Sequence, residues 1–221
     1  MKKESEAASA PATRGRTLDH AAGLYDWLSP AMMFWQEGRI GREAQRLLAL
    51  RGDERVLDIG CATGWLTQRI AKALTAPEAC AVGLDAAAKM IAVARRKAAG
   101  LEHLRFDVGV AERLGYGDGT FDCAISTFFF HHVDAELKRK SLAEIHRVVK
   151  PGGRVVVVDV DVPSNLLGRI CAWSGYWLFK QEEIRENIRG ELRRALTEAP
   201  FREVERVSRH FGYISVFTIV N

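Results

Sequence analysis

Short apolar runs and longer segments of helical period alternate along the chain from about residue 55. The runs are rich in β-branched residues, which is typical of strands. The first four are RVLDI (55–59), CAVGLD (80–85), HLRFDV (103–108) and FDCAIST (121–127). Between them, apolar residues recur at the spacing of one helix face. Strands that alternate with helices indicate βαβ units, so we expect a mostly parallel sheet.

The same alternation continues through residue 160. Asp134 is placed to cap a helix, and Pro151-Gly152-Gly153 is placed to end it. The next run, RVVVVDV (154–160), is continuously apolar, which is typical of a strand buried on both faces.

The pattern changes after residue 161. Residues 162–180 form an insertion, and residues 181–198 have the pattern of one charged amphipathic helix. Residues 201–220 contain two strand-like runs with no helix between them. Such runs pair antiparallel, so we expect an antiparallel end to the sheet.

The length of 221 residues suits a single domain. We expect residues 1–16 to be a disordered tail and residues 17–221 to be the domain, with an N-terminal helical cap over 17–50 and a lid-like insertion over 162–180. The apolar run from Leu166 to Phe179 is too short to span a bilayer.

Composition narrows the partners and the compartment. The net charge of +4 is mild and comes without a basic face with interleaved aromatics, so we expect no nucleic-acid partner. The four cysteines lie far apart, without a CxxC pair or a histidine at metal spacing, so we expect reduced thiols, no metal site and a cytoplasmic protein. They are Cys61, Cys80, Cys123 and Cys171.

The stretch RVLDIGCATGWLT (55–67) places Asp58 directly before a glycine-rich turn. Such turns usually cradle phosphate, which a nearby carboxylate would repel by roughly 1 to 4 kcal/mol. A dinucleotide fingerprint also needs glycine at its first, third and sixth positions. Counted from Gly60, the third and sixth positions are Ala62 and Trp65. A diphosphate ligand is therefore disfavoured.

A second carboxylate, Asp85, ends the next strand. Parallel sheets bind ligands at the carboxyl ends of their strands, so Asp58 and Asp85 should flank one crevice. Two carboxylates favour a ligand with a positive end and a ribose. S-adenosyl-L-methionine carries a sulfonium, an ammonium and an adenosine, and fits this crevice.

Four motifs extend this interpretation over roughly residues 50–160. They are VLDIGCATG (56–64), VGLDAAAKM (82–90), VAERLGYGDGTFD (110–122) and RVVKPGGR (147–154). Through them the chain resembles the class I S-adenosylmethionine-dependent methyltransferases, in the branch of the ubiquinone/menaquinone biosynthesis C-methyltransferases and related small-molecule and phospholipid methyltransferases. The resemblance implies an α/β fold: a Rossmann-like, doubly wound, seven-stranded and mostly parallel sheet with an antiparallel last strand.

The resemblance also implies cofactor contacts: a loop at the first turn, a ribose ligand at Asp85 and residues that flank or pack on adenine. With Asp58 toward the positive end, the expected cofactor residues are Tyr25, Asp58, Gly60, Thr63, Gly64, Asp85, Met90, Ala111, Glu112 and Thr127. Ala62 replaces the usual middle glycine, and Val110 replaces a frequent aspartate or asparagine. Adenine recognition at Val110 must therefore rest on backbone groups.

Several residues have two interpretations. His131 and His132 follow the fourth strand and are candidates for a general base, although structural hydrogen bonding is favoured. Residues 165–180 are a core-covering helix, a lid or acceptor pocket, or a peripheral membrane contact, since tryptophan and lysine at one end suit an interface. Cys61 and Cys123 are interpreted as packing residues rather than nucleophiles.

The leading function is methyl transfer to a small acceptor, hydrophobic ones included: a quinone precursor, a lipid head group or a secondary metabolite. Nucleic-acid or protein methylation is the alternative enzyme class, but the run STFFFHH (126–132) lacks the Asn/Asp-Pro-Pro-aromatic motif that grips a base amine. A non-catalytic S-adenosylmethionine-binding protein is a third class. The sequence leaves the acceptor and the oligomeric state open.

Overall fold

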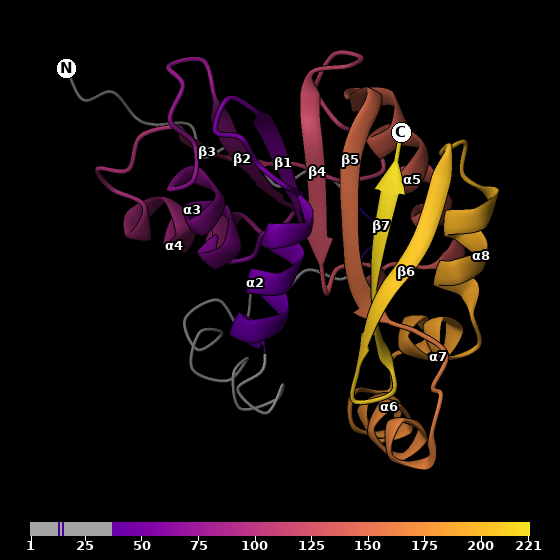
Figure 1. Cartoon of the computed structure of the whole chain (residues 1–221). Coiled ribbons are helices and arrows are strands. Elements are labelled where there is room, and N and C mark those ends of the chain that lie inside the picture. Colours follow the sequence, from indigo (N-terminus) through magenta and orange to yellow (C-terminus); the bar gives the residue numbers. More distant parts are fainter. Residues whose placement is uncertain (1–12, 14, 16–36) are drawn as a thin grey trace.

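A computed structural model describes residues 13, 15 and 37–221. Seven strands form one sheet in the order β3-β2-β1-β4-β5-β7-β6 (Figure 1). All neighbouring pairs from β3 to β5 are parallel, and β7 runs antiparallel to both β5 and β6. The expected doubly wound sheet with an antiparallel last strand is confirmed.

The strands are short at one edge of the sheet and long in its second half. Their bounds are β1 Arg55–Ile59, β2 Cys80–Asp85, β3 Leu104–Val108, β4 Phe121–Thr127, β5 Val149–Val160, β6 Glu203–His210 and β7 Ile214–Val220. The helices are α2 Glu37–Leu47, α3 Trp65–Ala71, α4 Ala88–Lys97, the 3-10 turn η2 Phe130–His132, α5 Ala135–Val148, α6 Leu166–Phe179, α7 Glu182–Ile188 and α8 Glu191–Glu198.

Apolar side chains cover both faces of the sheet because successive residues of a strand point to opposite sides. On β5, Val155 and Val157 pack in the cluster that includes α5 and α8. Val156 and Val158 pack in the cluster that includes α2 and α3. The helices α2, α3 and α4 therefore cover one face, and α5 and α8 cover the other (Figure 1). The expectation of a strand buried on both faces is confirmed.

Helix α5 begins as the sequence predicts, because the Asp134 side chain accepts a hydrogen bond from Leu137 N at 2.9 Å. Its end differs from the expectation. The helix ends at Val148, and Pro151-Gly152-Gly153 lies inside β5, which starts at Val149 rather than at residue 154. Proline disfavours helical backbone in the residue that precedes it, so the chain is already extended when it reaches Pro151.

The prediction of one helix over 181–198 is wrong. Helices α7 and α8 occupy this segment, and Gly190 lies between them with a φ of 95°. A left-handed residue cannot continue a right-handed helix, so the chain turns there and α8 starts in a new direction.

Part of the predicted domain organisation falls outside the described residues. In the segment 1–16 only Thr13 and Gly15 are described, and in the expected cap over 17–50 only 37–50 are described, including α2. In the described part of the chain, no helix is long and apolar enough to cross a membrane.

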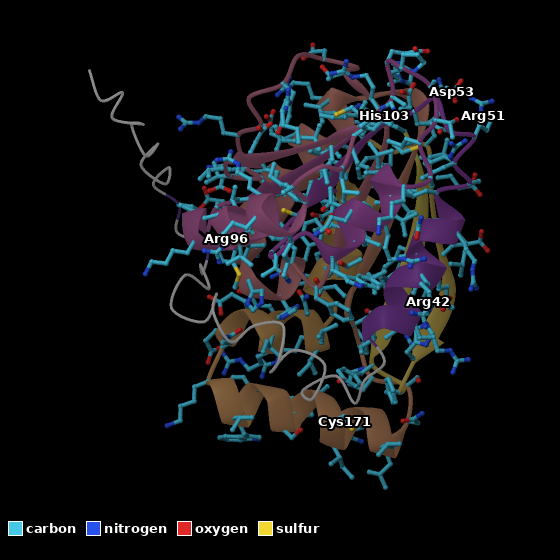
Figure 2. The ribbon with its side chains drawn as sticks, turned by 90° about the vertical axis from the view of Figure 1, so that its left-hand side faces the viewer. Arg42, Arg51, Asp53, Arg96, His103 and Cys171 are labelled. Atoms are coloured by element: carbon cyan, nitrogen blue, oxygen red, sulfur yellow. The ribbon has the colours of Figure 1, made fainter. Side chains whose placement is uncertain are left out.

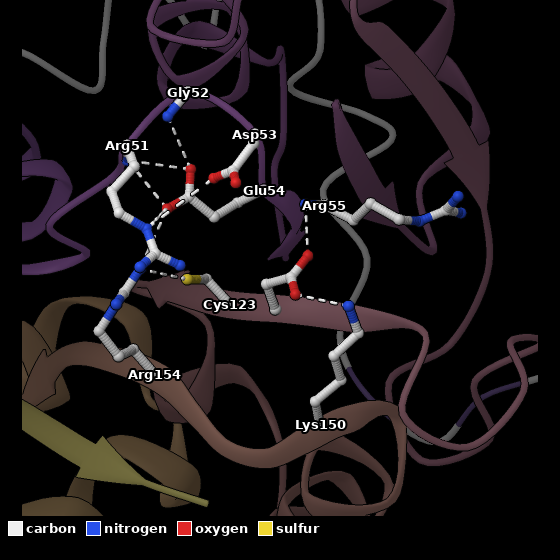
Figure 3. A network of polar contacts seen from close by, with 9 residues as sticks. Arg51, Gly52, Asp53, Glu54, Arg55, Cys123, Lys150 and Arg154 are labelled. Atoms are coloured by element: carbon white, nitrogen blue, oxygen red, sulfur yellow. Dashed lines mark hydrogen bonds and ion pairs between the residues drawn. The ribbon is translucent and has the colours of Figure 1, made fainter. Parts of the chain in front are cut away.

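Charged groups at the amino ends of the strands serve the fold (Figure 3). Glu54 is buried, and its carboxylate accepts hydrogen bonds from Arg51 N, Gly52 N and Arg154 Nη2. Burial alone raises the pKa of Glu54, but these backbone donors and the Arg154 charge outweigh it and leave the pKa lowered. Asp122 similarly joins Arg55 N to Lys150 Nζ. Both carboxylates therefore stabilise the fold through these hydrogen bonds.

Phe106 of β3 fills the space between β2 and the turn that follows β1. Two glycines make room for its ring: a Cβ on Gly83 would lie 2.6 Å from Phe106 Cδ1, and a Cβ on Gly64 would lie 2.4 Å from Phe106 Cζ. Phe106 thus packs against both the first turn, at Gly64, and β2, at Gly83.

We predict that Gly83→Ala lowers the free energy of unfolding by about 1–3 kcal/mol, because its methyl group overpacks the Phe106 site. Gly115→Ala is the matched control, since a Cβ there meets nothing within 4 Å. Urea unfolding measures both. The double variant Gly83→Ala/Phe106→Leu should lose less free energy of unfolding than the sum of the losses of the two single variants. A Gly83→Ala protein as stable as the control would contradict this packing.

Candidate functional site

A cleft of about 710 Å³, including the space at its open mouth, lies at the carboxyl ends of β1, β2 and β4. Its walls are Thr13, Gly15, Ile59, Gly60, Ala62, Leu84, Asp85, Ala86, Met90, Gly109, Val110, Ala111, Glu112, Thr127, Phe128, Phe129, His132 and Val133. The crevice that the sequence predicts therefore exists, and its position follows from the parallel sheet.

The turn between β1 and α3 forms one wall. Gly60, Ala62 and Gly64 all have left-handed backbone, with φ of 73°, 47° and 78°. The N–H groups of Gly60 and Cys61 both donate to Leu84 O, at 2.9 and 3.1 Å. A Cβ on Gly60 would lie 2.8 Å from Phe129 Cβ, so only glycine fits there. Ala62 adopts the left-handed conformation without being glycine, at a cost of about 1–2 kcal/mol.

Asp85 lies at the end of β2 and lines the cleft. Its Oδ2 accepts a hydrogen bond from Ala62 N at 2.9 Å, and its Oδ1 accepts one from Ala87 N at 2.8 Å. These bonds orient the carboxylate and join the first turn to β2. The carboxylate also lines the cleft, where it can accept hydrogen bonds from a ligand.

Asp58 lies beneath the turn rather than on the wall of the cleft. Its side chain is 2% exposed, and its Oδ2 accepts a hydrogen bond from Thr67 Oγ1 at 2.6 Å. Burial, together with the negative charge of Asp85, raises the pKa of Asp58 to about 7. Asp58 can therefore act on a ligand in the cleft through its charge, without direct contact.

Five of the other predicted cofactor residues lie on the wall of the cleft. Gly60, Met90, Ala111, Glu112 and Thr127 line the cleft.

Thr63 and Gly64 do not line the cleft. The Thr63 hydroxyl is buried and accepts a hydrogen bond from Lys97 Nζ at 3.3 Å, and Gly64 caps α3 above Phe106. Tyr25 lies outside the described residues.

Thr13 is a cleft residue that the sequence did not single out. Its Oγ1 donates to Glu112 Oε1 at 2.7 Å, although the two residues are far apart in the chain. Gly15 also lines the cleft, and a Cβ there would lie 3.1 Å from a methyl group of Val133. No motif marks these two positions, because the contacts are long-range.

His131 and His132 have different surroundings. His131 Nδ1 lies 2.8 Å from Oδ1 of Asp159, a fully buried carboxylate that also accepts from Phe130 N and Val160 N. This arrangement favours a structural role for His131. His132, whose ring lies 4.0 Å from that of His131, lines the cleft.

Phe128 and Phe129 form an apolar wall that the sequence interpretation missed. Phe128 has a φ of 57°, which is unusual for a bulky residue, and its N–H donates to Val158 O at 2.8 Å. The three consecutive phenylalanines 128–130 were the available signal. Two of them face the cleft, and Phe130 is fully buried.

The donor set of the cleft fits S-adenosylmethionine better than a diphosphate. Carboxylates of Asp85 and Glu112 line it, and no lysine or arginine does so among the residues that the structure describes. A cationic, phosphate-free nucleoside meets favourable charges in such a site, whereas a diphosphate meets repulsion.

We predict that Asp58→Asn changes how stability depends on pH. A raised pKa means that the folded protein retains a proton at Asp58 between pH 3.8 and about 7, where the unfolded chain has lost it. The stability of the parent protein therefore falls as pH rises through this window, by up to about 4 kcal/mol from this group. An asparagine side chain does not titrate and can still accept from Thr67, so the variant should lose less stability.

Urea unfolding of the ligand-free proteins across this window checks the prediction. Asp53→Asn, which replaces a carboxyl that is 60% exposed, is the matched control and should behave like the parent. Parallel stability curves for Asp58→Asn and the parent would contradict the raised pKa.

Sequence comparisons place the chain among known enzymes. A family model described as a methyltransferase domain matches residues 56–153. A ubiquinone/menaquinone biosynthesis C-methyltransferase of Geobacter sp. is 32% identical over 216 residues, which cover 89% of this chain and 91% of that protein. A demethylmenaquinone methyltransferase of Thermus thermophilus is 39% identical over 147 residues, which cover 65% of this chain and 64% of that protein.

Solved structures share the fold. A SAM-dependent methyltransferase from Aquifex aeolicus superposes with a TM-score of 0.65 at 19% identity, over 93% of this chain and 99% of that chain. A putative S-adenosyl-L-methionine-dependent methyltransferase from Methanococcus maripaludis gives a TM-score of 0.66 at 16% identity, over 93% of this chain and 96% of that chain.

The resemblance carried by the four motifs is thus confirmed by relatives over nearly the whole chain, and the cleft has the charges that the cofactor needs. The chain belongs to the class I S-adenosylmethionine-dependent methyltransferases, in the branch that contains the ubiquinone/menaquinone biosynthesis C-methyltransferases, and S-adenosylmethionine is its cofactor.

Proposed function

We propose that this methyltransferase acts on a small hydrophobic acceptor of the quinone-precursor class. The carrying observation is the combination of relatives named as demethylmenaquinone and ubiquinone/menaquinone methyltransferases with an aromatic wall in the cleft. Phe128, Phe129 and Val133 offer an apolar surface against which a flat ring can stack. A polar or nucleic-acid acceptor would leave this surface unmatched.

The cofactor contacts follow from the cleft. We assign Asp85 to the ribose hydroxyls, because its carboxylate is fixed at the end of β2, lines the cleft and accepts hydrogen bonds. Met90, which is 1% exposed, presents its side chain to the adenine position. Ala111 and Glu112 flank adenine through backbone groups, and Gly60 allows the backbone to approach the ligand closely.

The bound cofactor supplies an electrophilic methyl group on a sulfonium. The protein holds the reactants in line and excludes water, which accounts for much of the acceleration in such displacements. Asp58 contributes negative charge from beneath the turn. Because its pKa lies near neutrality, a cation in the cleft would favour its ionised form.

The acceptor must lose a proton when a carbon or oxygen is methylated. His132 is the only imidazole lining the cleft in the described part of the chain, and we assign it to accept this proton. His131, bonded to Asp159, positions η2 and hence His132.

A hydrophobic acceptor resides in membranes, so we also propose that the enzyme meets its acceptor as a peripheral membrane protein, through residues 165–180.

We predict that Asp85→Ala lowers the affinity for S-adenosylmethionine at least about tenfold, because hydrogen bonds to a charged acceptor are lost. Isothermal titration calorimetry measures the affinity, and thermal unfolding checks that the fold persists. Asp85→Asn retains one carbonyl acceptor and should lose less affinity. Unchanged affinity in a folded Asp85→Ala protein would refute the ribose assignment.

The acceptor class is tested with a methyl donor labelled on its methyl group. The enzyme is incubated with the donor and with separate lipid, quinone and polar metabolite fractions, and the label is followed. We expect label in the quinone fraction, and at least about tenfold less of it with Asp85→Ala at limiting donor. Label confined to polar metabolites would overturn the acceptor class, and donor binding without transfer to any fraction would favour a non-catalytic binding protein.

A further inference from the structure

Helix α6 (Leu166–Phe179, LLGRICAWSGYWLF) is apolar around almost its whole circumference. A helix on a protein surface normally has one apolar stripe facing the core and a polar face toward water. A helix that is apolar all round needs a second apolar or interfacial environment for its outer face. Helix α6 forms one end of the molecule, where Cys171 marks it (Figure 2).

The inner face of α6 meets the protein. Ala172 is buried in a cluster with Ile184 and Ile188 of α7, and Trp173 and Tyr176 pack against it. This part of α6 matches the interpretation as a core-covering helix.

The outer face of α6 is exposed. Eight large apolar side chains are exposed in the described part of the chain, and five of them lie on α6. They are Leu166 (72%), Leu167 (61%), Ile170 (59%), Trp177 (69%) and Leu178 (75%), and we call them the α6 surface. At 3.6 residues per turn, these five residues fall within about 120° of the circumference.

The structure holds this surface firmly. Asn165 caps α6 by accepting from Gly168 N at 2.7 Å, and Ser164 N donates to Gly212 O at 2.8 Å. Gly168 packs so close to the β6–β7 turn that a Cβ there would lie 2.7 Å from Gly212 C. The helix and the turn thus form one platform, and no residue of α6 lines the cleft.

The charged residues around the α6 surface indicate which kind of partner it binds. The segment 162–181 contains no aspartate or glutamate, whereas Arg169 and Lys180 are both exposed on it. Apolar side chains with tryptophan and flanking cations are the composition of helices that lie in the interface of an anionic bilayer.

The position of α6 also suits delivery of an acceptor. Strand β5 leads from Asp159, which holds His131 beside the cleft, through Val160, which packs against the α6–α7 cluster. Figure 1 shows α6 beyond the ends toward which β4 and β5 point, and the cleft opens at the same edge of the sheet.

We propose that the α6 surface docks on an anionic lipid bilayer, with α6 parallel to the membrane and its outer side chains among the head groups and upper acyl chains. This inference rests on the proposed hydrophobic acceptor, which would then enter the cleft from the bilayer to which the enzyme is bound.

The test is co-sedimentation of the full-length protein with vesicles of phosphatidylglycerol and phosphatidylcholine in equal parts, without cofactor or acceptor. The variant Ile170→Gln/Trp177→Gln replaces two side chains that are 59% and 69% exposed, so the fold should persist. We expect the parent to sediment with the vesicles and the variant to bind at least about tenfold more weakly, because two apolar side chains leave the interface.

Val207→Gln is the control for an apolar-to-glutamine change elsewhere on the surface, since Val207 is also exposed (38%) but lies on β6 outside the α6 surface. The control should bind as the parent does. Binding should weaken, but persist, on vesicles of phosphatidylcholine alone, because only the charge contribution is lost.

The following outcomes would overturn the proposal. One is a parent protein that does not sediment with either vesicle, or a double variant that binds as well as the parent. Another is a concentration-dependent dimer of the parent, seen by analytical ultracentrifugation, that the double variant loses while vesicle binding is absent; the α6 surface would then be an interface with a second copy.

A further such outcome is a double variant that loses methyl transfer to acceptor in detergent micelles but binds vesicles normally, which would make α6 a lid. The vesicle assay contains no methyl donor or acceptor. It can therefore fail while the labelled-methyl assay succeeds, and the reverse, so that the docking proposal and the proposed function are separated.

Discussion

The hydrogen bond from Ala62 N to the Asp85 carboxylate joins the two halves of the cofactor cleft. With the paired bonds from Gly60 N and Cys61 N to Leu84 O, it ties the first turn to the end of β2. Phe106 supports the same turn from below. These contacts fix the turn, with its left-handed residues, against β2 and β3. The ligand site therefore depends on packing between β1, β2 and β3 as well as on the motif itself.

Electrostatics then selects the ligand. Asp85 faces the cleft, Asp58 lies buried beneath it, and the described walls carry no lysine or arginine. Keeping Asp58 out of water is costly, as its raised pKa shows. A cation bound in the cleft offsets that cost, whereas a diphosphate would add to it. The same burial that weakens the fold near neutral pH thus favours a sulfonium ligand.

The two ends of the sheet divide their tasks. At the amino ends, Glu54 and Asp122 are neutralised by Arg154, Lys150 and backbone donors, and they serve stability. At the carboxyl ends, the polar groups face a cleft, and the insertion that forms α6 lies at the same edge. A parallel sheet produces this separation because all its strands end on one side.

The sequence by itself determined the alternation of strands and helices, the two-sided burial of β5, the antiparallel end and the chemical character of the ligand. These follow from local patterns: apolar runs, turn glycines and carboxylates at strand ends. Only the tertiary structure decided that Asp58 and Thr63 lie off the cleft, that Thr13 and Phe129 line it, and that α7 and α8 are separate helices. Side-chain direction at a turn and contacts between distant segments depend on packing in three dimensions, which a linear pattern does not contain.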